Sequence, residues 1–158
     1  MTISTQERIA ILRDIAESWL ELRKALFGLS EHELVEPNTV GTWSFKDLMA
    51  HITAWERLLI ERIRAMEEGR DTSELDEAEL DVDSFNAEAV RRQAQKPIDE
   101  VRQEYDRTHA ELMQLLETTP VLTRDLVAGD TYEHYREHLK DVLEFMRSRS
   151  PSRRKHLR

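Results

Sequence analysis

Apolar residues recur every three or four positions along four long stretches of this chain. Residues 9–26 carry the first series, and residues 45–66, 101–116 and 135–146 carry the other three. This period places apolar side chains on one face of an α-helix, whereas a strand needs strict alternation, which no stretch sustains. One-sided helices bury their apolar faces against each other. The pattern therefore predicts an all-α fold, a four-helix bundle with an additional short helix.

Capping residues and helix breakers indicate where these helices begin and end. Ser44 and Asp47 form a capping-box pattern before the second helix, Gly28 follows the first, and Pro97 opens the third. Asp130 or Thr131 suits the N-cap of the last helix. The expected helices cover residues 5–27, 45–68, 84–95, 97–117 and 131–146, of which 84–95 is the short, weakly amphipathic one.

The segments between the helices are predicted to be loops. Residues 29–41 contain Pro37 and Asn38, which mark a turn, and residues 121–127 form a short apolar connection. Residues 69–83 hold seven acids and one arginine. Because this run is too polar to pack in a core and too long for a tight turn, we expect an exposed loop that crosses the bundle or lies over an opening.

The composition limits the kinds of site that the chain can carry. It has no cysteine, so a metal ion would need His, Asp or Glu ligands. Its length suits a single domain at residues 1–148, followed by a basic tail at 149–158 that we expect to be disordered. The net charge of −9 argues against a nucleic-acid partner. No apolar run is long enough for a membrane span or a signal peptide, so we expect a cytoplasmic protein.

Two histidines, His134 and His138, lie four residues apart in the last predicted helix. Positions i and i+4 share one helix face, so both imidazoles can point at one ion. Tyr135 stands where zinc metalloprotease helices have a glutamate. His51 lies at the edge of the apolar stripe of the second helix and is the third candidate. Three imidazoles leave a coordination position open for water or substrate, as catalytic zinc sites do.

Whether these three histidines meet depends on the direction of their helices. At a rise of 1.5 Å per residue, His51 lies roughly 10 Å beyond the start of the second helix. His134 and His138 lie roughly 5 to 10 Å beyond the start of the last helix. Parallel second and last helices, as in an up-down-up-down bundle, bring the three to one level. Antiparallel helices lose this match unless they are offset. The alternative is three separate, half-exposed histidines with ordinary hydrogen bonds.

Further side chains are candidates for the surroundings of such a site. Trp43, Trp55 and Tyr135 are candidates for a substrate pocket, although Trp55 and Tyr135 also fit the helix core. We expect His109 to be exposed, since it lies away from the apolar centre of its helix. The acids that could orient a ligand imidazole, or simply lie on the surface, are Glu56, Glu133, Glu137 and Asp141.

Two segments resemble a known family. TWSFKDLMAHITAWE at residues 42–56 and EHYREHLKDVLEF at 133–145 resemble the tryptophan-led second helix and the H-x-x-x-H last helix of the DinB-like superfamily of four-helix bundles. The resemblance implies that His51, His134 and His138 bind a divalent ion, commonly zinc or nickel. It also implies a low-molecular-weight thiol as a further cofactor. The same segments resemble the ClbS/DfsB branch of similar bundles, some of which protect cells from reactive small molecules.

These observations favour a metal-dependent enzyme that acts on a small molecule by hydrolysis or thiol transfer. The ion would activate a water or a thiol, or polarise an electrophile. One alternative is a non-catalytic protein of the ClbS/DfsB type that sequesters a reactive compound without metal. Another is an interaction module that uses the acidic loop or the basic tail, as a homodimer through a helix face.

Overall fold

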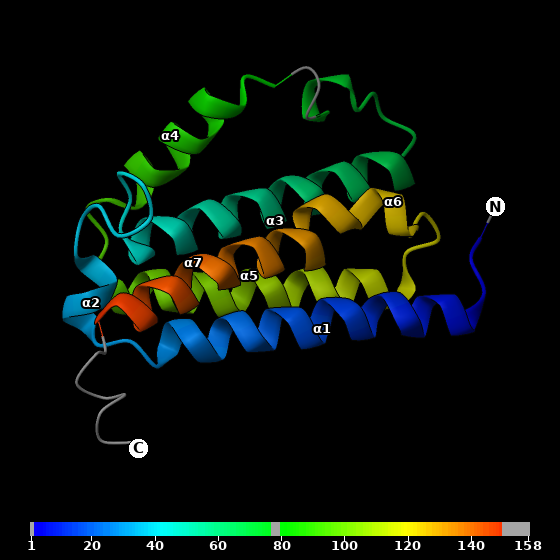
Figure 1. Ribbon diagram of the computed structural model, residues 1–158. Helices are drawn as coiled ribbons and strands as arrows, with labels where there is room; N and C mark the ends of the chain where they lie inside the picture. The colour runs from blue at the N-terminus through cyan, green and yellow to red at the C-terminus, as the bar shows by residue number, and fades with distance from the viewer. Residues whose placement is uncertain (1, 77–79, 150–158) are drawn as a thin grey trace.

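The protein is a bundle of long helices that lie side by side (Figure 1). The structure, a computed structural model, describes residues 2–76 and 80–149. The long helices are α1 (Thr5–Phe27), α3 (Phe45–Glu67), α5 (Ile98–Thr118) and α7 (Tyr132–Arg149). Their apolar faces meet in one buried cluster, and the residues within the described ranges form no strand. The prediction of an all-α bundle is confirmed.

The caps seen in the sequence set the helix starts. Ser44 accepts the backbone N–H of Asp47, and the Asp47 carboxylate accepts the N–H of Ser44 in return, which is the predicted capping box. At the start of α1, the Ser4 hydroxyl accepts the backbone N–H of Glu7. These bonds satisfy N–H groups that the first turn of a helix leaves unpaired. Because α3 begins at Phe45, His51 lies in its second turn.

Two segments predicted to be loops contain short helices. α2 (Glu31–Val35) lies within residues 29–41, and Ser30 and Glu33 form a capping box at its start. α6 (Arg124–Val127) and the 3₁₀ helix η2 (Ala128–Asp130) follow residue 123. The loop predictions are therefore wrong in these parts. The Ser-x-x-Glu pattern at Ser30 was a readable signal for α2.

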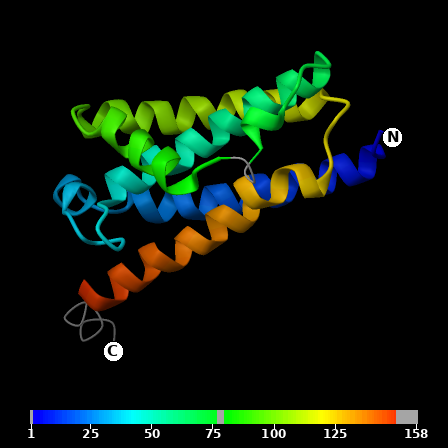
Figure 2. The same ribbon diagram turned by 90° about the horizontal axis from the view of Figure 1, so that it is seen from above.

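The acidic connection between α3 and α5 leads into a helix that lies against α3. It contains the 3₁₀ helix η1 (Ser73–Leu75) and α4 (Val82–Gln93), which begins two residues before the predicted short helix. Figures 1 and 2 show α4 returning along the outside of α3. This crossover carries the chain back, so α5 begins at the same end of the bundle as α3.

Because of this crossover, the four long helices do not alternate in direction along the chain, as they would in an up-down-up-down bundle. Phe45, at the start of α3, packs on Phe145 near the end of α7, with ring centroids 5.1 Å apart. Arg62, near the end of α3, lies 3.7 Å from Asp130, just before α7 begins. The start of α3 thus lies beside the end of α7, and the end of α3 lies beside the start of α7. The two helices are antiparallel. The histidines therefore do not meet in the way expected for parallel helices, in which they would lie at similar distances from the helix starts.

The histidines meet because α7 starts partway along α3. The α6 and η2 segment lies beside the second half of α3, and α7 begins only at Tyr132. The first two turns of α7 therefore lie beside the second turn of α3. This is the offset that antiparallel helices require.

The last helix extends one residue into the predicted basic tail. α7 includes Arg149, the first residue of the predicted tail, which forms an ion pair with Glu36. The predicted disorder of residues 150–158 lies outside the described residues, as do residues 77–79 of the acidic run. Within the described ranges, no helix combines the length and apolar character needed to cross a membrane.

Candidate metal centre

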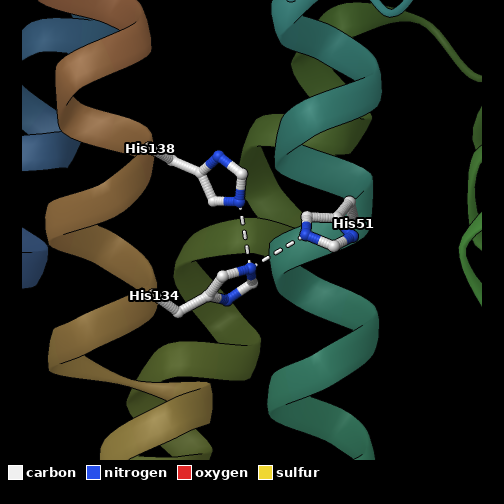
Figure 3. Close-up of side chains that lie close together, drawn as sticks. All are labelled: His51, His134 and His138. Atoms are coloured by element: carbon white, nitrogen blue, oxygen red, sulfur yellow. Dashed lines mark hydrogen bonds between the residues drawn. The ribbon is translucent and has the colours of Figure 1, made fainter. Parts of the chain in front are cut away.

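Three imidazoles from α3 and α7 converge on one point (Figure 3). Nε2 of His51 lies 2.8 Å from Nε2 of His134, and Nε2 of His138 lies 3.0 Å from the same atom. The candidate ligand atoms of the three residues all lie within 4.8 Å of one another. The side chain of His51 is buried and those of the other two are half-buried. The sequence-predicted trio is therefore one cluster and not three separate histidines.

Asn86 of α4 fixes the tautomer of His51. Its Oδ1 atom accepts the indole N–H of Trp55 at 2.7 Å, which identifies this atom as the amide oxygen because an indole nitrogen only donates. The same oxygen lies 3.0 Å from Nδ1 of His51, so Nδ1 carries the hydrogen and donates it. The Nε2 atom of His51 therefore presents its lone pair to the cluster.

Asp141 has the same effect on His138. Its Oδ2 atom lies 3.0 Å from Nδ1 of His138, one turn back along α7. An ionised carboxylate only accepts hydrogen bonds, so Nδ1 donates and Nε2 keeps its lone pair. Of the acidic candidates from the sequence, Asp141 is the one that contacts a cluster histidine. Such partners orient metal-bound imidazoles and increase their basicity.

His134 lies between these two lone pairs. A neutral imidazole carries one ring hydrogen, so His134 can satisfy at most one of its two Nε2 contacts. Its Nδ1 atom is buried without a hydrogen-bond partner in the described part of the chain. Three Nε2 atoms share at most one hydrogen here, which is an arrangement that a cation at their centre would stabilise. The donor set therefore fits a divalent metal ion.

The electrostatics of the cluster also suit metal binding. Burial lowers the pKa of His51 to about 4, and the neighbouring His138 lowers it further. Burial and the same neighbour lower the pKa of His134 to about 3. Both imidazoles are neutral at pH 7, the form that metal binding requires. A tetrahedral site with metal–nitrogen bonds of about 2.0–2.1 Å separates its ligand nitrogens by about 3.3 Å, so small side-chain rotations suffice to admit an ion.

A hollow of about 370 Å³, open to solvent, leads to the histidines. Trp43 and Trp55, two of the candidates for a substrate pocket, are among its lining residues. Tyr135 is not among its lining residues; it is fully buried and its hydroxyl lies 3.5 Å from His109. The remaining lining residues, besides the three histidines, are Val82, Asn86, Gly129, Asp130 and Glu137.

Several polar residues lie where the sequence did not place them. His109 is 6% exposed, so the prediction that it faces solvent is wrong. It contacts Glu56, which is fully buried in the core and does not orient a cluster imidazole. Glu137 lines the hollow, whereas Glu133 is exposed on the surface of α7. Asn86 was missed because it lies on a crossover helix whose path the sequence does not reveal.

The profile of the DinB superfamily matches residues 14–147, a span that includes all three histidines, the whole of α3 and all but the last two residues of α7. No curated protein and no solved structure matches the chain.

Proposed function

Because the chain belongs to the DinB superfamily, we propose that its three converging imidazoles form the divalent-metal site of an enzyme that acts on a small molecule. The observation that carries this proposal is that the Nε2 atoms of His51 and His138 both lie within hydrogen-bonding distance of Nε2 of His134. Two of them present lone pairs, fixed by Asn86 and Asp141. Burying these three nitrogens without enough hydrogen-bond donors costs free energy unless a cation binds between them.

His51, His134 and His138 would hold the ion, with zinc or nickel as the preferred candidates. When bound, a divalent cation lowers the pKa of a water or thiol that reaches it and polarises an electrophile. Three protein ligands leave room for such a group on the side that faces the hollow. Asn86 and Asp141 keep the ligand rings in place. Hydrolysis and transfer of a low-molecular-weight thiol are the two reaction types that this arrangement supports.

The hollow supplies the other requirements of a reaction. Trp43 lies against His51 with ring centroids 5.0 Å apart, and Trp55 forms a second aromatic wall. These walls would hold an apolar or flat part of the substrate next to the imidazoles. The Glu137 carboxylate, also at the hollow, forms no hydrogen bond or ion pair with the residues that the structure describes. We assign it the role of proton acceptor from the attacking water or thiol.

Elemental analysis tests the metal site directly. The protein is purified without added metal and compared with the variant His51→Ala/His138→Ala. Near-stoichiometric zinc or nickel in the native protein and its loss in the variant support the proposal. Absence of metal from the native protein, even after incubation with zinc or nickel, contradicts it. His32→Ala is the matched control, because His32 is exposed on α2.

A second candidate is a binding protein that sequesters a reactive compound without metal. The two tryptophans of the hollow favour it, since aromatic walls bind small molecules whether or not a reaction follows. A metal-free protein that binds one equivalent of an aromatic electrophile without releasing product would support this function in place of the enzyme. Multiple turnovers that stop when the metal is removed would exclude it.

A further inference from the structure

A buried polar cluster, separate from the three histidines, joins all four long helices. Trp19 comes from α1, Glu56 from α3, His109 from α5 and Tyr135 from α7. Glu56 and Tyr135 are 0% exposed and His109 is 6% exposed. None of these four side chains lines the hollow. The cluster therefore has no direct contact with substrate, and its role must be sought in how the helices are held.

The contacts within this four-helix cluster are specific. Nδ1 of His109 lies 3.0 Å from Oε2 of Glu56, and the Tyr135 hydroxyl lies 3.5 Å from the same nitrogen. The Trp19 indole stacks flat on the imidazole, with centroids 3.9 Å apart and an interplanar angle of 1°. Burial raises the pKa of Glu56, and His109 opposes this rise. His109 of α5 thus contacts one side chain from each of the other three long helices.

Such a centre contributes to specificity more than to stability. Removing a carboxylate and an imidazole from water costs free energy that their mutual contact only partly returns. The contacts form only when the helices lie in one register, because a shift of one helix would leave a buried polar group unpaired. A buried polar group can in this way select one arrangement among several that apolar packing permits.

The cluster lies directly beside the metal-ligand positions. Tyr135 follows His134 on α7. Glu56 lies five residues after His51 on α3, which is about 7.5 Å along a helix axis. The register of α3 against α7 is therefore fixed within two turns of the imidazoles that must converge. We propose that Glu56, His109 and Tyr135 are positioning residues that set the spacing of His51 and His134, an inference that rests on the proposed metal site.

The double variant Glu56→Leu/His109→Phe separates positioning from mere stability. It replaces the polar pair with apolar groups of similar size and keeps an aromatic ring on Trp19, so that the Tyr135 hydroxyl is the one polar group of the cluster that loses its partner. Such replacements often retain or raise stability. Glu56→Gln is the conservative variant, since a side-chain amide can still form a hydrogen bond with His109. Leu116→Ala is the control, because it leaves a cavity in the core on α5 without touching the cluster.

Two readouts are needed, one with metal and one without. Zinc affinity is measured by competition titration under conditions in which every variant is folded. The metal-free readout is the nuclear Overhauser effect between the ring protons of His51 and His134. We expect the double variant to bind zinc at least about 10-fold more weakly and to lose this effect, while Glu56→Gln and Leu116→Ala keep both.

The outcomes distinguish this inference from the proposed function. Zinc affinity within about two-fold of native and an unchanged ring-proton effect in the double variant overturn the positioning role. Failure of the native protein to bind zinc or nickel overturns the metal site, and the ring-proton comparison then still decides whether the cluster positions the histidines. If the double variant does not fold, Tyr135→Phe, which removes only the hydroxyl, takes its place under the same two criteria.

Discussion

The Nε2 atoms of His51 and His134 lie 2.8 Å apart, although the two residues are 83 positions apart in the chain and belong to antiparallel helices. Neither helix brings this contact about alone. It requires the late start of α7 and the return of the chain through α4. Because the two imidazoles, with His138, present unsatisfied nitrogens to each other, the contact has measurable consequences.

Metal should stabilise the folded protein in a histidine-dependent way. An ion that binds only the folded state adds about 2.7 kcal/mol when its concentration is 100 times the dissociation constant. Zinc or nickel should therefore raise the midpoint of thermal unfolding of the native protein by several degrees. His51→Ala/His138→Ala should show no such rise. Differential scanning fluorimetry with and without chelator measures this, and an equal rise in both proteins would contradict specific binding at the cluster.

The metal-free protein should lose stability as the pH falls below neutrality. The pKa of His51 is lowered to about 4 and that of His134 to about 3. Between about pH 6.5 and these values the unfolded chain binds protons that the folded chain excludes, so protonation favours unfolding. The expected loss is on the order of a few kcal/mol by pH 4.

Urea unfolding at a series of pH values measures this loss of stability. His51→Gln/His134→Gln should give a flatter profile over the same range, since glutamine does not titrate. A profile as steep as that of the native protein would mean that other groups cause the dependence.

Asn86 should control metal affinity through His51. In Asn86→Leu the N–H groups of His51 and Trp55 lose their common acceptor. Loss of such a partner typically weakens metal binding by about 10- to 100-fold. Asn86→Asp keeps an acceptor and should remain much closer to native. Isothermal titration with zinc compares the two, with Arg91→Ala on the exposed side of α4 as control.

Glu137 should affect turnover and not metal content. Glu137→Gln keeps the shape of the side chain at the hollow but cannot accept a proton, and loss of a general base typically costs about 10²- to 10⁴-fold in rate. Metal content should stay at the native level. The measurement is product formation on the substrate found in a screen of hydrolysable and thiol-reactive compounds. Glu133→Gln, an exposed neighbour on α7, should leave the rate unchanged, and an equal loss there would remove Glu137 from the mechanism.

Much of the fold could be predicted from local patterns. The apolar period of three to four residues marks all four long helices, and the caps at Ser4 and Ser44 place two of their starts within one residue. These features depend on neighbours along the chain, which a sequence displays directly. The same holds for the His134 and His138 pair, since one helical turn is enough to put both on one face.

Local patterns were insufficient wherever the answer depended on contacts between distant segments. His109 lies off the apolar centre of its helix, which suggested exposure, yet Glu56 and Trp19 bury it. Asn86 lies on a weakly amphipathic helix with no pattern to indicate that it would bond His51. A polar residue can be buried whenever another element supplies its partner, and helical periodicity contains no information about that partner.

Local sequence patterns predict the four long helices and α4, and they place His134 and His138 on one turn of α7; the composition excludes thiolate ligands. The tertiary structure decided that α3 and α7 are antiparallel, that α4 lies over the site, and that His51 joins the pair. The reason is physical: helix formation depends on residues three and four positions apart, whereas helix direction depends on how a long connection crosses the bundle. That path is fixed by packing of the whole chain, and it turns three scattered histidines into one cluster.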